Sequence, residues 1–98
     1  MNGKKIKGKK YNKGYLIFEG DLFNERKWTG KGKEYYQFGI LRFEGDILNG
    51  EGKEYYWNGK LEYEGEFLNG KRNGEGKEYN SNDELIYEGK YLNGERVK

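Results

Sequence analysis

The stretch that decides the fold is YEGEFLNGKRNGEGKEYN, Tyr63 to Asn80. Much of it alternates between apolar and charged residues, which is typical of a β-strand with one buried face. It also contains Gly65, Gly70, Gly74 and Gly76, although glycine weakens a strand through its conformational freedom. A fold that repeatedly sets glycine beside aromatic rings must give the missing side chains a role.

The same motif recurs along the chain. The triplet Phe/Tyr-Glu-Gly begins at positions 18, 43, 63 and 87, and therefore at intervals of 25, 20 and 24 residues. Between the triplets stands Gly-Lys-Glu/Lys-Tyr, which begins at Gly8, Gly32, Gly52 and Gly76. Such a period is typical of a stacked array in which each unit supports its neighbours. We expect one repeat domain over residues 1–98, of about four units, with 1–4 and 95–98 as its least ordered segments.

Turn signals fix the expected pairing within each hairpin. Asn58-Gly59 favours a two-residue type I′ turn, which places Glu54 opposite Tyr63 and Gly52 opposite Gly65. A turn at Phe38-Gly39 and a loop over 81–84 give the same pattern in their hairpins. The sequence therefore predicts an all-β protein, a single-layer, twisted antiparallel meander of about eight strands built from repeated β-hairpins.

A turn at Asn49-Gly50 completes this scheme. It places Ile47 opposite Gly52 and Asp46 opposite Lys53, so that successive repeats are offset by two residues, roughly 7 Å. The predicted sheet is therefore a slanted ribbon.

The pairing separates two faces. The ring face carries the aromatic residues and the paired glycines, and the ladder face carries alternating charges such as Asp46, Lys53 and Glu64. Opposite charges on neighbouring strands contribute about 0.2–1 kcal/mol per pair. We expect glycine pairs such as Gly52 and Gly65 to form a floor on which rings lie flat, the alternative being that these glycines mark bulges or bends.

The segment Tyr63 to Gly76 resembles the MORN (membrane occupation and recognition nexus) repeat, whose core is Y-E-G-E-W-x-N-G-K-x-H-G-x-G. The resemblance recurs with gaps over nearly the whole chain, and the spacing is also similar to bacterial antitoxin-like MORN-variant repeat proteins. It implies an elongated single-layer sheet with an aromatic groove, used for scaffolding, protein–protein binding and dimerisation, and an affinity for acidic phospholipids. The family's tryptophan is replaced here, by Leu22, Ile47, Phe67 and Tyr91.

The composition argues against catalysis and cofactor binding. The chain has no Cys and no His, so it cannot assemble a triad of nucleophile and imidazole base. The expected backbone separation of Glu34 and Glu54, about 12 Å, exceeds the roughly 5–9.5 Å of glycosidase carboxylate pairs. The run 82–84 lacks the spacing of a calcium loop. We therefore predict no enzyme, no cofactor and no metal.

Charge and hydropathy argue against a nucleic-acid partner and against a membrane-spanning or secreted protein. A net charge of +2 is too small to indicate nucleic-acid binding. No apolar run is long enough for a membrane span, and the basic N-terminus lacks the apolar region of a signal peptide. We predict a cytoplasmic protein.

The ring face is the predicted functional surface, because a single layer leaves aromatic rings half covered and such patches usually mark interaction sites. We expect a groove that binds a protein or peptide partner, or a second copy as in a homodimer. The alternative is that the rings merely cover one another and form the core. The predicted groove residues are Phe18, Tyr36, Phe43, Tyr56, Tyr63, Phe67, Tyr87 and Tyr91.

The N-terminal lysines give a second hypothesis. Each lysine near an acidic membrane surface contributes about 1 kcal/mol, so the cluster predicts peripheral binding of acidic phospholipids. A solvated sheet edge or a flexible tail is the alternative. The cluster consists of Lys4, Lys5, Lys7, Lys9, Lys10 and Lys13.

Overall fold

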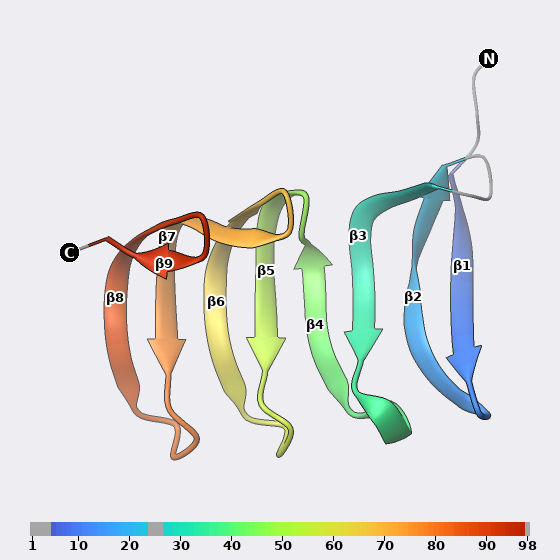
Figure 1. The fold of residues 1–98 in the computed structure, drawn as a ribbon, viewed down its shortest axis with the longest axis horizontal. Coiled ribbons are helices and arrows are strands. Elements are labelled where there is room, and N and C mark those ends of the chain that lie inside the picture. The colour runs from blue at the N-terminus through green and yellow to red at the C-terminus, as the bar shows by residue number, and fades with distance from the viewer. Residues whose placement is uncertain (1–4, 24–26, 98) are drawn as a thin grey trace.

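A computed structural model of the chain describes residues 5–23 and 27–97. It is one open antiparallel sheet in which each strand pairs with its neighbours in sequence (Figure 1). The layer measures 44 × 32 × 14 Å, which confirms the predicted single-layer meander. The elements are β1 (Lys5–Asn12), β2 (Tyr15–Phe23), β3 (Lys27–Tyr35), the 3₁₀ turn η1 (Gln37–Gly39), β4 (Leu41–Asp46), β5 (Asn49–Tyr55), β6 (Leu61–Leu68), β7 (Lys71–Tyr79), β8 (Leu85–Leu92) and β9 (Glu95–Arg96).

The glycines set the register of the whole sheet. Gly45 lies opposite Gly52, Gly52 opposite Gly65, Gly65 opposite Gly76, and Gly76 opposite Gly89. The predicted pairings of the β3–β4, β5–β6 and β7–β8 hairpins are confirmed at these positions. Equivalent residues of successive units therefore stand in straight rows across the strands.

The predicted turn at Asn49-Gly50 is wrong. The chain reverses earlier, at Ile47 and Leu48, because Asp46 Oδ1 accepts hydrogen bonds from the backbone N–H groups of Leu48 (3.2 Å) and Asn49 (3.1 Å). Such a carboxylate closes a turn by replacing a backbone acceptor.

The earlier turn moves the register of β4 against β5 by two residues. The charge ladder consequently runs through Glu44, Lys53 and Glu64, and not through Asp46. Phe43 and Tyr63 both pair with Glu54, so the predicted offset between repeats is absent and the rows are not slanted.

The tip of the β5–β6 hairpin also differs from the predicted type I′ turn. The N–H of Tyr56 donates to the carbonyl of Lys60 (2.8 Å), which leaves a three-residue loop with Gly59 at φ +88°. Three-residue loops with a left-handed glycine are the next most common hairpin connection. The inner register still holds because a bulge at Glu62 absorbs the extra residue.

The core is a row of aromatic rings on the ring face. Phe43, Phe67, Tyr63, Tyr91 and Tyr87 meet edge to face in that order, with centroid distances of 5.1, 5.3, 5.1 and 5.3 Å. The first four are between 0% and 3% exposed. Edge-to-face pairs contribute about 0.5–1.5 kcal/mol beyond area burial, so the row supplies most of the core.

The ring row lies over the glycine row, as the sequence predicts. A Cβ atom added to Gly52 would lie 2.7 Å from Cε1 and Cζ of Phe43, and one added to Gly76 would collide with the ring of Tyr63. Gly74 lies within β7, where it pairs with Tyr91 of β8.

Paired tyrosines fasten neighbouring hairpins to one another. On the ladder face, the hydroxyl groups of Tyr35, Tyr55 and Tyr79 donate to Glu19 (2.8 Å), Glu44 (2.5 Å) and Glu64 (2.8 Å) of the preceding strands. The following tyrosines reach forward, since Tyr36 donates to the carbonyl of Tyr55 and Tyr56 to that of Tyr79, both at 2.6 Å.

These hydrogen bonds predict alkaline unfolding. Burial, followed by the hydrogen bond to Glu44, raises the pKa of Tyr55 from 10.0 to about 12. The neutral hydroxyl is therefore favoured in the folded state, so its contribution is complete below pH 10 and is lost as pH rises from 10 towards 12. We expect Tyr55→Phe to lower the free energy of unfolding by about 1 kcal/mol at pH 7 and by progressively less above pH 10.

Urea denaturation followed by circular dichroism at pH 7, 9, 10 and 11 measures this effect. Tyr11→Phe is the matched control, because Tyr11 is 61% exposed and its hydroxyl has no hydrogen bond to another residue in the described part of the chain. A deficit in Tyr55→Phe that stays constant with pH would show that the hydroxyl does not titrate as inferred.

Candidate functional site

The predicted groove residues divide into a buried and an accessible set. Phe43, Tyr63, Phe67 and Tyr91 are buried against one another, so they cannot touch a partner while the sheet is intact. The members that keep exposed surface are Phe18, Tyr36, Tyr56 and Tyr87. Four of the eight predicted residues therefore form the buried core, and the other four remain partly exposed.

Arg72 is the centre of the polar part of the ring face, although it is not among the residues predicted from the sequence. Its guanidinium lies 2.7 Å from Glu54, 3.3 Å from Glu62 and 3.5 Å from Glu78. It also lies 4.5 Å from the ring centroid of Tyr63. The signal in the sequence is that ring-face carboxylates need a cation, and long arginine side chains reach residues that strand pairing does not place opposite them.

The pKa values of these carboxylates follow their surroundings. Burial raises the pKa of Glu62, and the charge of Arg72 opposes that shift without cancelling it. Burial would also raise the pKa of Glu78, but hydrogen bonds from Arg96 and Tyr91 and the charge of Arg72 together lower it. Glu34 forms its own ion pair with Arg42. The ring-face carboxylates are thus held as ion pairs, an arrangement that neutralises charge beside the core.

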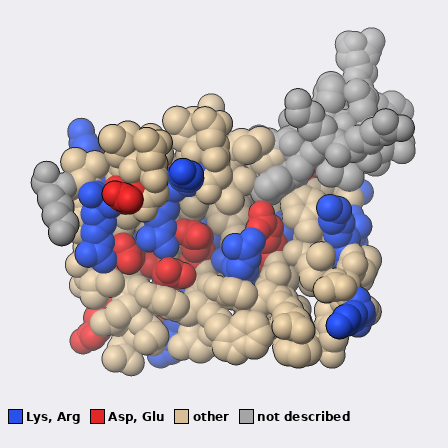
Figure 2. Space-filling model, in the orientation of Figure 1, with Lys and Arg blue, Asp and Glu red and all other residues tan. Residues whose placement is uncertain are grey.

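An exposed aromatic cluster lies at the end of the strands where η1 and the β5–β6 turn are found. Tyr15 meets Phe38 edge to face at 5.3 Å, Phe38 meets Trp57 at 6.4 Å, and Trp57 meets Tyr36 at 5.3 Å. Tyr15, Phe38 and Trp57 are 45%, 56% and 51% exposed. Figure 2 shows a stretch of uncharged surface along this lower edge of the molecule. Of these residues, only Tyr36 is among the predicted groove residues.

Phe38 has an unusual backbone. Its φ is +76°, in the left-handed region where a bulky side chain is a genuine outlier. In other turns of the chain, the left-handed residue before a glycine is Lys13, Asn69 or Asn93. The signal in the sequence is the phenylalanine itself, because Phe38-Gly39 puts a bulky residue where turns usually carry a small polar one.

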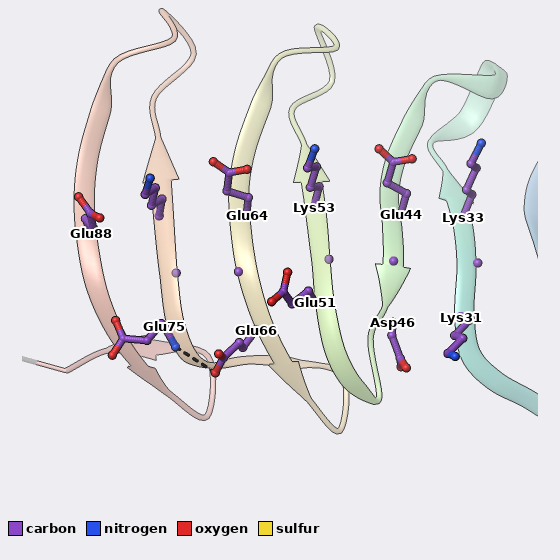
Figure 3. A pocket seen from close by; sticks show the side chains of 16 residues that line it. Lys31, Lys33, Glu44, Asp46, Glu51, Lys53, Glu64, Glu66, Glu75 and Glu88 are labelled. Carbon is purple, nitrogen blue, oxygen red and sulfur yellow. Dashed lines mark hydrogen bonds between the residues drawn. The ribbon is translucent and has the colours of Figure 1, made fainter.

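The hollow of the molecule is on the ladder face, opposite the predicted groove. It is an open trough of about 970 Å³ with a floor of paired glycines. Figure 3 shows its two walls. One wall alternates Lys33, Glu44, Lys53, Glu64, Lys77 and Glu88, and the other contains Lys31, Asp46, Glu51, Glu66 and Glu75.

The two walls of the trough differ in charge pairing. The first wall places opposite charges on neighbouring strands throughout, which stabilises the sheet. In the second wall Glu51 lies directly opposite Glu66, a like-charge pair that destabilises it. The trough is therefore a polar surface with an acidic margin.

The lysines of β1 do not share one face. Lys7 forms an ion pair with Asp21 at 3.1 Å, and Lys9 and Lys10 project to opposite faces because strand side chains alternate. In Figure 2 the blue atoms on the β1 side of the molecule form separate patches. Lys13 lies in the β1–β2 turn at φ +52°, while Lys4 and the side chain of Lys5 lie outside the described residues.

Comparisons with protein-family models, with curated proteins and with solved structures found no match to this chain. Within residues 5–23 and 27–97 there is no helix long and apolar enough to cross a membrane. The same described residues contain no cluster of acidic side chains suited to hold a metal ion. In the loop 80–84, Asp83 instead pairs with Lys60 at 3.1 Å.

Proposed function

We propose that this chain is a non-enzymatic interaction module that binds an extended peptide of a partner protein. The contact is the exposed aromatic cluster of Tyr15, Tyr36, Phe38 and Trp57. The observation that carries the proposal is Phe38, which is more than half exposed although it occupies a backbone conformation unfavourable to its side chain. Strained, exposed residues concentrate at functional sites.

The geometry of the cluster favours a particular kind of peptide. Successive rings are inclined at 70° to 88° to one another, so that the cluster presents both ring faces and ring edges to a partner. Proline-rich segments in the polyproline II conformation dock into aromatic-lined slots, and they lose little entropy because they are extended before binding. A segment of this type is the partner we infer.

The resemblance to the MORN repeat supports the same class of function. That family implies scaffolding and protein–protein binding through aromatic residues on one sheet face. The proposal keeps protein–protein binding as the function. It places the contact at the exposed aromatic cluster beside η1, because the ring row is buried and the cluster remains accessible.

A double substitution tests the proposal. We expect Phe38→Asn with Trp57→Lys to weaken binding of short synthetic proline-rich peptides by about 30-fold or more, since loss of an aromatic anchor costs about 2 kcal/mol. Asparagine tolerates the left-handed conformation, so the fold should survive, and circular dichroism checks that it does. Leu68→Asn, at an apolar residue that is 43% exposed away from the cluster, should bind like the unsubstituted chain.

Two results would contradict the proposal. One is the absence of peptide binding, measured by tryptophan fluorescence and by calorimetry, up to millimolar peptide. The other is equal binding by the double variant. Sedimentation with acidic phospholipid vesicles, lost when Lys9 and Lys10 are changed to Gln, would assign the lysine strand as the functional surface instead.

A further inference from the structure

The outer edge of β8 is largely unpaired. Its inner edge pairs with β7 from Leu85 to Tyr91, but β9 pairs only with Tyr91 and Leu92. Within the described residues, no strand therefore lies beside 85–89 on the outer side. Leu85 and Ile86 are 50% and 46% exposed there. An edge of this kind is a template for pairing with another chain.

The strand that would fit this edge is already present in the chain, at its other end. In the array, strands with Phe/Tyr-Glu-Gly are followed by strands with Gly-Lys-Glu/Lys-Tyr, as in β2–β3, β4–β5 and β6–β7. β8 has the first sequence, and β1 has the second, from Gly8 to Tyr11. Among the residues that the structure describes, no strand pairs with the outer edge of β1, whereas β3, β5 and β7 each have a neighbour on that side.

We propose that β8 of one copy pairs with β1 of a second copy, so that the sheet continues from one molecule into the next. The register of the array then places Gly89 opposite Gly8, as Gly20 lies opposite Gly32 and Gly65 opposite Gly76. β1 and β7 point in the same direction in Figure 1. A second copy placed beside the first without being turned over therefore presents β1 antiparallel to β8.

The charges at the two edges are complementary. Glu88 would lie opposite Lys9, as Glu44 lies opposite Lys53 and Glu64 opposite Lys77. The contact would end at Gly89, because the carbonyl of Lys90 already accepts a hydrogen bond from the N–H of Val97 (2.9 Å).

The tyrosine–glutamate hydrogen bond that joins neighbouring strands of the array would also form between the two copies. Tyr35, Tyr55 and Tyr79 each donate to the glutamate of the preceding Phe/Tyr-Glu-Gly strand. Tyr11 and Glu88 are the corresponding residues of β1 and β8. Tyr11 is 61% exposed, and among the described residues neither the Tyr11 hydroxyl nor the Glu88 carboxylate has a hydrogen bond or ion pair. The Tyr11 hydroxyl of one copy and the Glu88 carboxylate of another are thus available to form this hydrogen bond.

This contact is heterologous, because it joins two different edges. A heterologous contact does not close into a twofold dimer; it joins molecules head to tail into open chains, or into rings where the rotation between copies closes. It uses a different surface from the aromatic cluster, so the two proposals can fail independently.

Sedimentation velocity from about 10 μM to about 1 mM tests the proposal. We expect the average mass to rise above 11.6 kDa with concentration. Glu88→Lys and Lys9→Glu should each weaken association about tenfold. The double variant should restore it, since it re-forms the pair between molecules and keeps the net charge of +2. Glu51→Lys, the same charge change in the middle of the sheet, should associate at least as well as the unsubstituted chain.

Amide hydrogen exchange locates the contact in the unsubstituted chain. Protection of the amides of 85–89 should increase with concentration. A monomeric mass at 1 mM, equal association by the single variants, or no recovery in the double variant would overturn the proposal. Loss of association in the Phe38→Asn and Trp57→Lys variant would also overturn it, by making the aromatic cluster the contact between copies.

Discussion

Replacing Arg72 with methionine is expected to lower the free energy of unfolding by about 3 kcal/mol at pH 7, the lower end of the range for breaking a buried ion pair. The side chain of Arg72 is 16% exposed, and those of Glu54, Glu62 and Glu78 between 17% and 30%. Without the guanidinium these three carboxylates repel one another beside the core. Methionine preserves most of the apolar packing over Tyr63, so the loss reports mainly the charge.

The pH dependence distinguishes this explanation from a packing defect. In the unsubstituted chain the pKa of Glu78 is lowered from 4.5, so its stabilisation is present above pH 4.5 and is lost as pH falls below that value. In the variant Glu62 loses the charge that opposes its raised pKa. Glu78 keeps Arg96 and Tyr91 but loses the charge of Arg72, so both carboxylates gain protons more readily in the folded state. The difference in stability between the two proteins should therefore shrink as pH falls from 7 to 4.

Urea denaturation at several pH values measures this difference. Lys71→Met is the matched control, because it removes the same charge from an exposed neighbour and should cost less than about 0.5 kcal/mol. A deficit in Arg72→Met that persists unchanged at pH 4 would indicate lost packing and not unpaired carboxylates.

Adding a single methyl group at Gly52 is expected to destabilise the fold by about 1–3 kcal/mol, the usual cost of overpacking. Gly52 is buried, and its added Cβ would lie 2.7 Å from two ring atoms of Phe43. The backbone of Gly52 does not have a positive φ, so alanine meets only a steric obstacle there. In most strands the same change would be favourable, because alanine loses less conformational freedom than glycine.

A double-mutant cycle with Phe43→Leu identifies the obstacle. Phe43→Leu alone should lose the edge-to-face contact with Phe67 and leave a partial cavity. Combined with Gly52→Ala it should cost less than the sum of the two single changes, because the smaller side chain makes room for the methyl group. Strictly additive free energies would mean that the ring does not rest on Gly52. Thermal and urea unfolding of the four proteins provide the values.

The register of three hairpins could be predicted from the sequence, because the turns at Asn58-Gly59 and Phe38-Gly39 and the loop 81–84 each placed glycine opposite glycine. The predicted turn at Asn49-Gly50 is wrong because Asp46, three residues before Asn49, accepts the backbone N–H groups of Leu48 and Asn49 and closes the turn earlier. A carboxylate that caps its own turn depends on local side-chain geometry, which residue alternation does not contain. As a result Phe43 and Tyr63 lie in the same row across the strands, without the expected offset of two residues.

The candidate site was less predictable than the fold. Alternation identified which rings share a face, but not that Phe43, Tyr63, Phe67 and Tyr91 would cover one another completely. Arg72 and Trp57 act through long side chains that reach neighbours outside their own pairs. The exposed cluster also depends on η1, which brings Phe38 to Tyr15 and Trp57.

The glycine row is the line along which the sheet bends most easily. Gly45 and Gly65 have φ values of +128° and +157°, and neighbouring glycines continue the same line from strand to strand. No Cβ atom stiffens the sheet along this line, and the rings obstruct bending on one side. The ribbon can therefore bend most easily towards its charged side, so its curvature, and with it the width of the trough, is governed by the aromatic residues on the opposite surface.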